Sequence, residues 1–379
     1  MNFYIHIPFC RQKCPYCKFA LTPIFDEAKK RRYIAHLKHE IQGYFEISRS
    51  RNIDTIYFWW GTPSVLTLEE VADILSCFEK GETTEISFEC NPEDITSEYV
   101  NGLFQLGITR LSIGIQSLND DTLKAIHRSD RASISHALDA IWSVIARNES
   151  VPVTNDVAIQ VPEILDCFVP RNDKNTTLSI NIDFILGLPY SKVWETLENI
   201  RELHDRFPFI THTSVYMLED WLYPKEWSGT SISEYGIEQE YADICAYFDT
   251  LGWTHYEISN WSKPGYECQH NQGYWNHTNS RGFGLSATSY EGGKRWENSH
   301  SFSGYYQWDK IQEEFLTDEQ IELEKIIFDI RTFSLSEGDF SKTKIEELIA
   351  KKYITRKEGK ILLTPTWIFR ENTIISELI

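Results

Sequence analysis

Residues 4–17 read YIHIPFCRQKCPYC, and this stretch decides the fold because it joins a first strand to a loop with three cysteines. The first four residues alternate between apolar and polar or aromatic side chains as a β-strand does, and Pro8 ends the strand. Cys10, Cys14 and Cys17 follow, separated by three and by two residues. Three thiolates with this spacing can hold three irons of a cubane iron–sulfur cluster and leave the fourth iron open to an exchangeable ligand.

A structural zinc site is the alternative for these cysteines. Such a site needs four closed ligands, and the loop offers no fourth cysteine. His6 could serve, but it lies in the alternating strand, where a histidine packed in the core is equally expected. The loop follows the first strand, where α/β barrels keep their functional residues, and this position favours the cluster. The Cys-x3-Cys-x2-Cys loop resembles the signature of the radical S-adenosylmethionine (SAM) superfamily.

Strands and helices alternate over the residues that follow. Strands are predicted at 53–60, 85–89, 110–116, 181–186 and 213–218, and helices at 26–44, 67–78, 97–106 and from Asp120. Thr67 and Glu70 form a capping box at the start of one helix. With the first strand, six strands separated by helices predict an α/β fold whose parallel sheet is a partial (β/α)6 barrel.

Three units are expected along the chain. Residues 1–220 form the core barrel, with an insertion at about 148–179 that Pro152, Pro162 and Pro170 mark. Residues 221–310 form an extension that begins with a connecting loop at 221–236. Residues 311–379 form a small helical or winged-helix-like domain.

The net charge of −19 argues against a nucleic-acid partner, because phosphate binding needs clustered lysine and arginine. The basic run at 29–32 is predicted to be a solvated helix face, and peripheral contact with an anionic membrane is the alternative. No run approaches eighteen apolar residues, no secretory leader is recognisable, and the remaining five cysteines are scattered. These features predict a cytoplasmic protein with reduced thiols.

Polar residues recur where the predicted strands end, and there they would surround one mouth of the barrel. Gly61 and Thr62 follow the second strand, Glu89 ends the third, Gln116 ends the fourth, and Asp183 lies in the fifth. Such groups suit an amino acid's ammonium, ribose hydroxyls and the edge of adenine. Together they predict a pocket for a nucleoside linked to an amino acid.

Five motifs, YIHIPFC, GTPSVL, ECNPEDI, RLSIGIQSLND and NIDFILGLP, resemble the coproporphyrinogen-oxidase-like branch of the radical SAM superfamily. The resemblance implies that Cys10, Cys14 and Cys17 ligate a 4Fe-4S cluster and that SAM chelates its open iron. It implies SAM contacts from Tyr4, Tyr16, Gly61, Thr62, Glu89, Gln116, Arg128 and Asp183.

One departure from the family pattern concerns the glycines that precede Thr-Pro-Ser. Here Trp59 and Trp60 stand before Gly61. Glycine lets a backbone approach a ligand closely, so a tryptophan side chain directed into that space would block SAM, whereas one turned outward would leave the path intact. A degenerate protein that keeps the fold and cluster without binding SAM is therefore one hypothesis.

Two features distinguish functions within this branch. Oxygen-independent coproporphyrinogen oxidases resemble Cys-x3-Cys-x2-Cys-x-Cys, and Phe19 stands here at the fourth cysteine position. HNQGYW at 270–275 resembles the His-Asn-x-x-Tyr motif of the heme chaperones in this branch. His270 is then predicted to ligate heme iron, with Cys268 and His277 as further candidates. The alternative is a histidine with local hydrogen bonds, while Tyr274 and Trp275 pack in the core.

The resemblance implies a heme chaperone that binds a 4Fe-4S cluster, SAM and heme, forms a homodimer, and transfers heme to acceptor hemoproteins of respiration. The alternative is a radical SAM oxidoreductase in which the reduced cluster cleaves SAM and hydrogen is abstracted from a porphyrinogen. That enzyme would need basic groups for propionates, and only Arg110 and Arg128 are expected near the mouth. The sequence therefore does not predict coproporphyrinogen oxidase activity.

Overall fold

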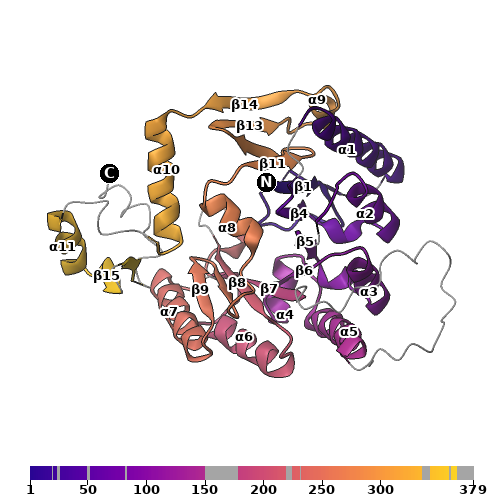
Figure 1. Cartoon of the computed structure of the whole chain (residues 1–379). Coiled ribbons are helices and arrows are strands. Elements are labelled where there is room, and N and C mark those ends of the chain that lie inside the picture. Colours follow the sequence, from indigo (N-terminus) through magenta and orange to yellow (C-terminus); the bar gives the residue numbers. More distant parts are fainter. Residues whose placement is uncertain are drawn as a thin grey trace.

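The computed structural model describes residues 1–18, 20–23, 26–48, 52–81, 83–149, 178–218, 224–230, 232–334, 342–357 and 360–364. One twelve-stranded sheet organises these residues (Figure 1), in the order β14-β13-β12-β11-β1-β4-β5-β6-β7-β8-β10-β9. Its centre holds the six predicted strands, all parallel: β1 (Asn2–Ile7), β4 (Thr55–Gly61), β5 (Glu85–Cys90), β6 (Arg110–Gln116), β7 (Ser179–Leu186) and β8 (His212–Met217). The predicted partial α/β barrel is confirmed.

Both edges of the sheet come from later parts of the chain. β11 (Ser280–Phe283) pairs parallel with β1 and is followed outward by antiparallel β12 (Thr288–Glu291), β13 (Lys294–Asn298) and β14 (Lys310–Phe315). At the other edge, β10 (Asn260–Ser262) pairs antiparallel with β8 and with β9 (Thr254–Glu257). The sheet therefore continues through the boundary expected near residue 220. These short strands carry many polar residues, so they lack the apolar runs by which the central strands were recognised.

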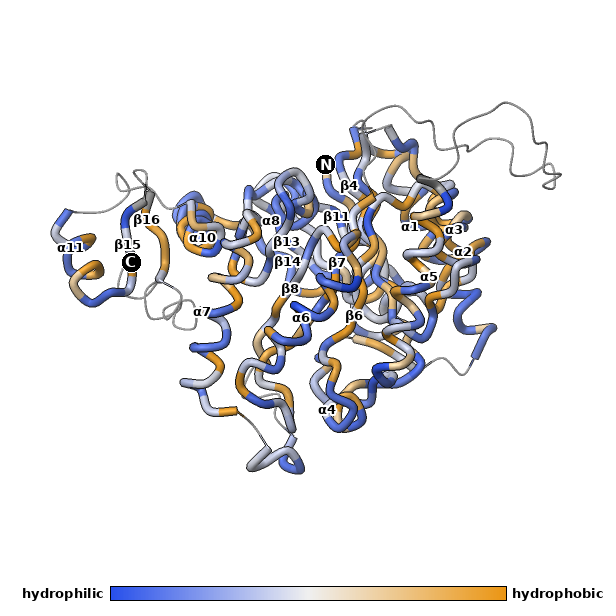
Figure 2. Tube along the Cα trace, turned by 90° about the horizontal axis from the view of Figure 1, so that it is seen from below, coloured by the Kyte–Doolittle hydropathy of each residue, from blue (hydrophilic) through white to orange (hydrophobic). Residues whose placement is uncertain are grey.

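Helices connect the central strands and cover the sheet. They are α1 (Glu27–Ile47), α2 (Leu68–Leu75), α3 (Ser97–Gln105), α4 (Asp120–Ala125), α5 (Arg131–Glu149), α6 (Glu195–Arg206) and α7 (Glu234–Thr250). The capping box of Thr67 and Glu70 is present at the start of α2. In Figure 2 helices such as α7 alternate between blue and orange along their length. α7 was not predicted, and its first turn occupies the end of the expected loop at 221–236.

The buried core runs through successive strands. Phe3, Phe58, Phe88 and Phe184 come from four different strands, and each is almost completely inaccessible to solvent. Burying a side chain of this size typically contributes about 1.5–3 kcal/mol. The outer helices are thereby fixed on the sheet, and the strand ends that carry polar residues hold constant positions.

The basic run at 29–32 is not a fully solvated helix face, which corrects the prediction. Lys30 is buried on α1 and forms an ion pair with Glu70 of α2, 3.1 Å from nitrogen to oxygen. Lys29 and Arg32 lie over the rings of Phe302 and Tyr306 in α9 (Phe302–Tyr306). The run therefore has a packing role, because the charges pair with a carboxylate and with aromatic faces.

The remaining elements are small. β2 (Phe9–Cys10) and β3 (Thr22–Pro23) pair within the cysteine loop, and α8 (Gln269–Trp275) precedes β11. α10 (Asp318–Arg331) packs against α8, and α11 (Lys342–Ala350) is followed by a hairpin of β15 (Ile354–Lys357) and β16 (Lys360–Leu363). Most of the expected insertion at 148–179, and the last helix expected after Pro365, lie outside the described residues.

Candidate functional site

A cavity of about 380 Å³ opens at the carboxyl ends of the central parallel strands, and we call it the cysteine cavity. The loop after β1 brings the three cysteines to it, and the ends of β4 to β7 bring the polar groups. All the predicted cluster and SAM residues except Tyr4 line it: Cys10, Cys14, Cys17, Tyr16, Gly61, Thr62, Glu89, Gln116, Arg128 and Asp183. The structure thus brings together residues as far apart in the sequence as Cys10 and Asp183.

The three cysteines fit a cluster better than a single metal ion. Among the described residues, no three His, Cys, Asp or Glu side chains converge on a position for one ion. A zinc ion needs its sulfur ligands at about 2.3 Å, whereas each iron of a cubane takes its own thiolate, so cluster cysteines surround a larger volume. No disulfide joins the described cysteines. Cys10 Sγ accepts a hydrogen bond from the Thr62 hydroxyl at 3.0 Å, which orients it at the cavity wall.

Two carboxyl groups give the cysteine cavity its electrostatic character. Burial raises the pKa of Glu89 well above its ordinary value, and repulsion from Asp183 adds to this, while the Trp60 amide 3.3 Å away opposes it. Burial also raises the pKa of Asp183, and hydrogen bonds from Ser112 at 2.9 Å and Asn181 at 2.8 Å oppose the shift. Two buried carboxyl groups in one pocket favour a cationic ligand, because a positive charge relieves their repulsion.

Two irregularities in the strands direct side chains at this mouth. The register of β6 against β7 shifts between Gly114 and Gln116, and Gln116 has a φ of 71°. The register of β1 against β4 shifts between His6 and Ile7, next to Trp60 with a φ of 60°. Bulges of this kind commonly re-aim a side chain beside a site. Neither bulge was predicted, because a bulge has no distinct residue pattern in a single sequence.

Gly61 is required by the neighbouring backbone. Its φ is 68°, and a Cβ built on it would lie 1.8 Å from the carbonyl oxygen of Ile7. The sequence-based argument explained glycine here by close approach of the ligand. The structure adds a stronger reason, because no side chain fits between β4 and β1 at this point.

Trp59 and Trp60 face different environments. Trp59 stacks on Tyr57, with ring centroids 5.2 Å apart and planes at 13°, and it lines the cysteine cavity. Trp60 packs edge-on to Tyr4 at 5.7 Å and His6 at 6.0 Å, and it is not among the residues that line this cavity. Trp60 is therefore turned away from the cysteine cavity, and the two tryptophans leave that cavity open.

Several polar residues of the site were missed from the sequence. Asn91 accepts a hydrogen bond from Arg128 Nη1 at 2.7 Å, and Arg128 also donates to the Gly114 carbonyl. Asn181 links Asp183 to His212, whose Nδ1 lies 2.6 Å from the Asn181 oxygen. The available signal was a polar residue within an otherwise apolar strand, since such a residue must find a partner when buried.

Arg110 does not lie at the mouth, contrary to the expectation. It begins β6, whereas the mouth lies at the carboxyl ends of the strands. Its Nη1 donates to Ser179 Oγ at 2.7 Å and to the Tyr266 carbonyl at 3.1 Å. Of the two arginines proposed to hold propionates, Arg128 alone lines the cysteine cavity.

A second cavity of about 660 Å³ adjoins the first, and we call it the tryptophan cavity. Trp59 and Tyr216 line both cavities. Tyr4, predicted as a SAM contact, lines this second cavity and not the first. Other walls come from β11 to β13, from α8 and from α10. These elements lie near one another in Figure 1.

His270, the predicted heme ligand, is a fully buried residue of α8. Its Nδ1 lies 2.6 Å from the Thr55 hydroxyl and its Nε2 lies 3.0 Å from the Tyr274 hydroxyl. Burial lowers its pKa to about 3. With both ring nitrogens hydrogen-bonded, His270 offers no lone pair to iron in this structure. This geometry agrees with the alternative of a histidine bonded locally in the core.

Cys268, the second candidate for heme attachment, is also buried. Burial, followed by the nearby Glu85 carboxylate, raises the pKa of its thiol to about 12. Its Sγ lies 3.6 Å from Glu85 Oε1. A thiol in this state is a poor nucleophile and a poor metal ligand at neutral pH, because the thiolate is the reactive form.

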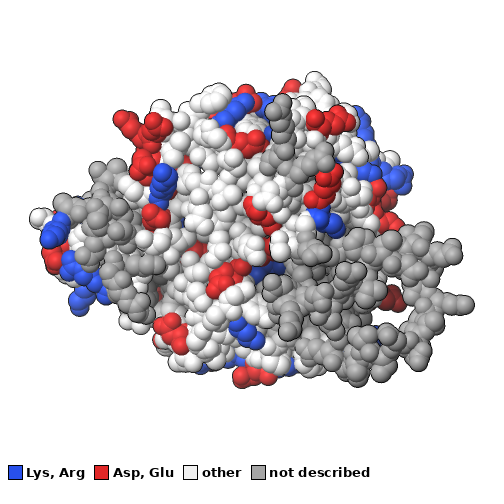
Figure 3. Space-filling model, in the orientation of Figure 1, with Lys and Arg blue, Asp and Glu red and all other residues white. Residues whose placement is uncertain are grey.

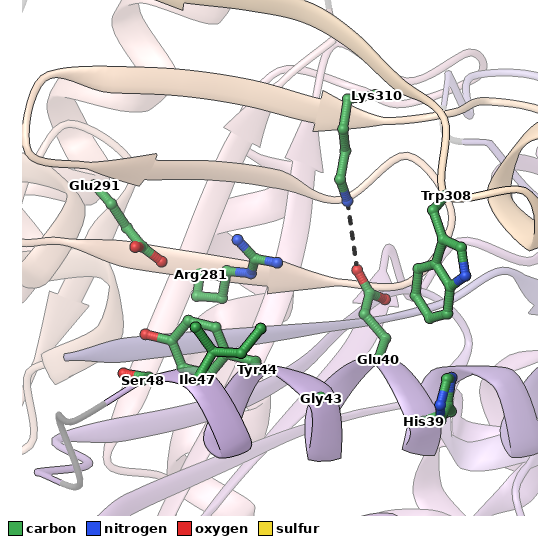
Figure 4. A pocket seen from close by; sticks show the side chains of 10 residues that line it. All are labelled: His39, Glu40, Gly43, Tyr44, Ile47, Ser48, Arg281, Glu291, Trp308 and Lys310. Atoms are coloured by element: carbon green, nitrogen blue, oxygen red, sulfur yellow. Dashed lines mark ion pairs between the residues drawn. The ribbon is translucent and has the colours of Figure 1, made fainter.

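A third hollow of about 530 Å³ lies between α1 and the edge strands β11 to β14 (Figure 4). Glu40 lies 3.8 Å from Lys310 there and accepts hydrogen bonds from the Gly284 amide, from Asn298 and from the Tyr305 hydroxyl. These bonds join α1 to the edge of the sheet. None of the predicted site residues lines this hollow, so we assign its polar groups a structural role.

In Figure 3 acidic and basic side chains are interspersed and no continuous basic patch is visible. Within the described part of the chain, no helix is both long and apolar enough to cross a membrane.

Comparison with known proteins agrees with this geometry. The family model described as "Radical SAM superfamily" matches residues 4–148. The solved structure of coproporphyrinogen III oxidase (HemN) from Escherichia coli, described as a radical SAM enzyme, superposes with a TM-score of 0.75 at 19% identity, covering 100% of this chain and 89% of that chain. At this identity the likeness establishes the fold alone. Residues 4–148 are therefore similar to the radical SAM superfamily, and the whole chain shares the fold of HemN.

Curated relatives carry the name heme chaperone HemW. The relative from Synechocystis is 29% identical over 315 residues, which cover 80% of this chain and 69% of that protein. The relative from Escherichia coli strain K12 is 26% identical over 76% of this chain and 69% of its own length. The relative from Bacillus subtilis is 26% identical over 95% of this chain and 94% of its own length. The chain therefore resembles HemW over most of its length.

Proposed function

We propose that this protein is a heme chaperone, which binds heme together with a 4Fe-4S cluster and SAM and transfers the heme to acceptor hemoproteins. The observation that carries the proposal is the cysteine cavity, where three cysteines and the strand-end polar groups meet in a chain similar to HemW over most of its length. Phe19 in place of a fourth cysteine supports a chaperone over an oxidase.

The residues present have distinct tasks in this proposal. Cys10, Cys14 and Cys17 would hold the cluster, whose open iron the amino and carboxylate groups of SAM would chelate. Glu89 and Asp183 would attract the positive charges of SAM, because burial in one pocket makes their own negative charges costly. Arg128 holds the ends of β5 and β6 together through Asn91 and Gly114 and thereby fixes the width of the mouth.

Three further parts of the proposal concern the protein's surroundings. We place it in the cytoplasm, as expected from the scattered spacing of the cysteines outside the loop. Its partners are heme and respiratory hemoproteins that receive the heme, and it acts as a homodimer. Membrane contact, if formed, is peripheral, and no nucleic acid is bound, given the net charge of −19.

An anaerobic titration of the cluster-reconstituted protein with hemin, followed by absorbance, tests the proposal. We expect saturable binding of one heme per chain. Absence of saturable binding would contradict the chaperone function. In that case the alternative, a radical SAM oxidoreductase acting on a porphyrinogen, would be tested by incubating the reduced protein with SAM and coproporphyrinogen III and measuring decarboxylated product.

A further inference from the structure

Three polar atoms in the tryptophan cavity are buried without a partner. Tyr4 Oη, Trp275 Nε1 and His277 Nε2 all belong to residues that line this cavity, and none of them has a hydrogen-bond partner among the described residues. Buried polar groups are nearly always paired, so several unpaired groups facing one cavity indicate a ligand. In the cysteine cavity, by contrast, both oxygens of Asp183 accept hydrogen bonds, and among the described lining residues only Arg128 Nε is a buried side-chain atom without a partner.

The cavity walls suit a large flat ring. Trp59, Trp60, Tyr216, Trp275 and Phe328 supply aromatic faces and edges from four different elements. The volume of about 660 Å³ lies within the range of roughly 300–1,000 Å³ that cofactor sites typically occupy. Aromatic side chains stack favourably on a conjugated macrocycle.

His277 is the histidine in this cavity that can reach a metal. It follows the end of α8, and its ring packs on Phe328, with centroids 4.7 Å apart, and against Tyr290 at 5.6 Å. The nearest carboxylate oxygen to its Nε2 belongs to Glu324 at 3.9 Å, beyond hydrogen-bonding range, and Glu324 is itself paired with Arg295 at 2.5 Å. Burial lowers the pKa of His277, so the ring is neutral near pH 7, as a metal ligand must be.

The cavity also carries cations that suit carboxylates. Arg295 and Arg331 line it, and Arg331 lies over the Trp275 ring at 5.1 Å. Guanidinium groups recognise carboxylates through paired hydrogen bonds. Because Arg295 already forms ion pairs with Glu314 and Glu324, the aromatic walls and the neutral imidazole are the features that favour an iron porphyrin here.

We propose that the tryptophan cavity is the heme site and that His277, and not His270, supplies the imidazole ligand to the iron. This inference rests on the proposed function and adds the location and the ligand. Trp59 and Tyr216 then separate the heme from the cysteine cavity, so the two cofactors lie on either side of a shared aromatic wall.

His277→Gly is a suitable variant because folding should tolerate it. His277 has a φ of 51°, in the left-handed region where glycine is more favourable than histidine. We expect hemin affinity to fall by about tenfold or more, and the absorbance bands of imidazole ligation to disappear, because a metal ligand is lost. Added imidazole should restore the bands. His136→Ala, an exposed histidine of α5, is the control and should bind hemin as the wild type does.

Metal-free protoporphyrin separates ligation from stacking. It has no iron, so the wild type and His277→Gly should bind it with equal affinity. Ile327→Trp on α10 fills the tryptophan cavity and should weaken binding of both hemin and protoporphyrin, while SAM binding in the cysteine cavity stays unchanged and reports a folded protein.

Two different results would overturn the inference. If the wild type binds hemin and His277→Gly keeps the same spectrum and an affinity within about twofold, His277 is not the ligand although the proposed function stands. If Ile327→Trp leaves both affinities unchanged, the heme lies outside this cavity. If the wild type shows no saturable hemin binding, the proposed function and the inference both fail.

Discussion

The cysteine cavity and the tryptophan cavity share a wall and differ in almost every other respect. The first is built at the ends of consecutive strands, and several of its polar groups are bonded in pairs, Asp183 with Ser112 and Arg128 with Asn91. The second is assembled from strands of both sheet edges together with α8 and α10, and some of its polar atoms have no partner among the described residues. Most polar groups of the first cavity are therefore satisfied within the protein, whereas the unpaired atoms of the second are the basis of the proposal that it binds a ligand.

This difference determines which variants should cause large effects. The largest effect should come from Cys10→Ala or Cys14→Ala, because each removes a thiolate on which one iron depends. We expect nearly complete loss of reconstituted iron, of acid-labile sulfide and of the cluster's visible absorbance. Cys77→Ala and Cys245→Ala are matched controls, since neither cysteine lines the cysteine cavity, and both should retain a full cluster. A full cluster in Cys10→Ala would contradict the proposal that the cysteine cavity holds the cluster.

Gly61→Ala tests the wall where β1 and β4 meet. The added Cβ would overlap the Ile7 carbonyl oxygen, and φ is 68°, so we expect a loss of roughly 3 kcal/mol or more in the free energy of unfolding. Gly43→Ala in α1 has nothing within 4 Å of its Cβ and should instead stabilise by up to about 1 kcal/mol. Urea unfolding monitored by circular dichroism compares the two. Equal stabilities would contradict the close approach of the strands.

His270→Ala separates a core histidine from a cavity histidine. The variant removes the hydrogen bonds that the His270 ring forms with the Thr55 and Tyr274 hydroxyls. We therefore expect the free energy of unfolding to fall by about 2 kcal/mol. Burial lowers the His270 pKa to about 3, so the folded state holds fewer protons, and this part of wild-type stability falls as pH drops from about 6.5 towards 3. The free energy of unfolding of the variant should not show this decrease at acid pH. A stable His270→Ala that fails to bind hemin would instead support His270 as the ligand.

Glu89→Gln probes the charge of the cysteine cavity. Burial, reinforced by Asp183, raises the Glu89 pKa, so the folded state binds this proton more tightly than the unfolded state does. The free energy of unfolding therefore decreases as pH rises through the raised pKa of Glu89. A glutamine at this position has no proton to lose, so the variant does not show this decrease. We expect the variant to unfold at higher urea than the wild type at pH 8, with the gap narrowing towards pH 5, and to bind SAM more weakly. Tighter SAM binding would contradict the attraction assigned to this carboxylate.

Trp60→Gly should have the smallest effect on SAM. Trp60 lines the tryptophan cavity only, so SAM affinity should change by less than about threefold. Trp59→Gly removes the wall between the cavities and should change the affinities for both SAM and hemin. Equilibrium dialysis with labelled SAM measures the first affinity. A large gain of SAM affinity in Trp60→Gly would revive the hypothesis that this tryptophan blocks the site.

The cysteine cavity was largely predictable from sequence because its residues stand at fixed places in repeating units. A strand followed by Cys-x3-Cys-x2-Cys, and polar residues such as Glu89 and Asp183 at strand ends, must meet at one edge of a parallel sheet. The tryptophan cavity was not predictable. Its lining residues, such as Tyr4 and Phe328, are distant in the sequence, and they meet only because the later strands and helices pack at the edges of the sheet. The HNQGYW motif pointed to His270 as a heme ligand, and this stays a prediction, but a motif gives no information about which ring nitrogens are already hydrogen-bonded.

Native mass spectrometry of the reconstituted protein with one equivalent of hemin tests the central claim most directly. The account predicts a species whose mass equals one chain plus one 4Fe-4S cluster plus one heme, in monomer or dimer, because the cluster and heme occupy separate cavities. His277→Gly should shift the population to the chain with cluster alone. Heme that appears only on chains lacking the cluster would contradict the claim, because the two groups would then compete for one site.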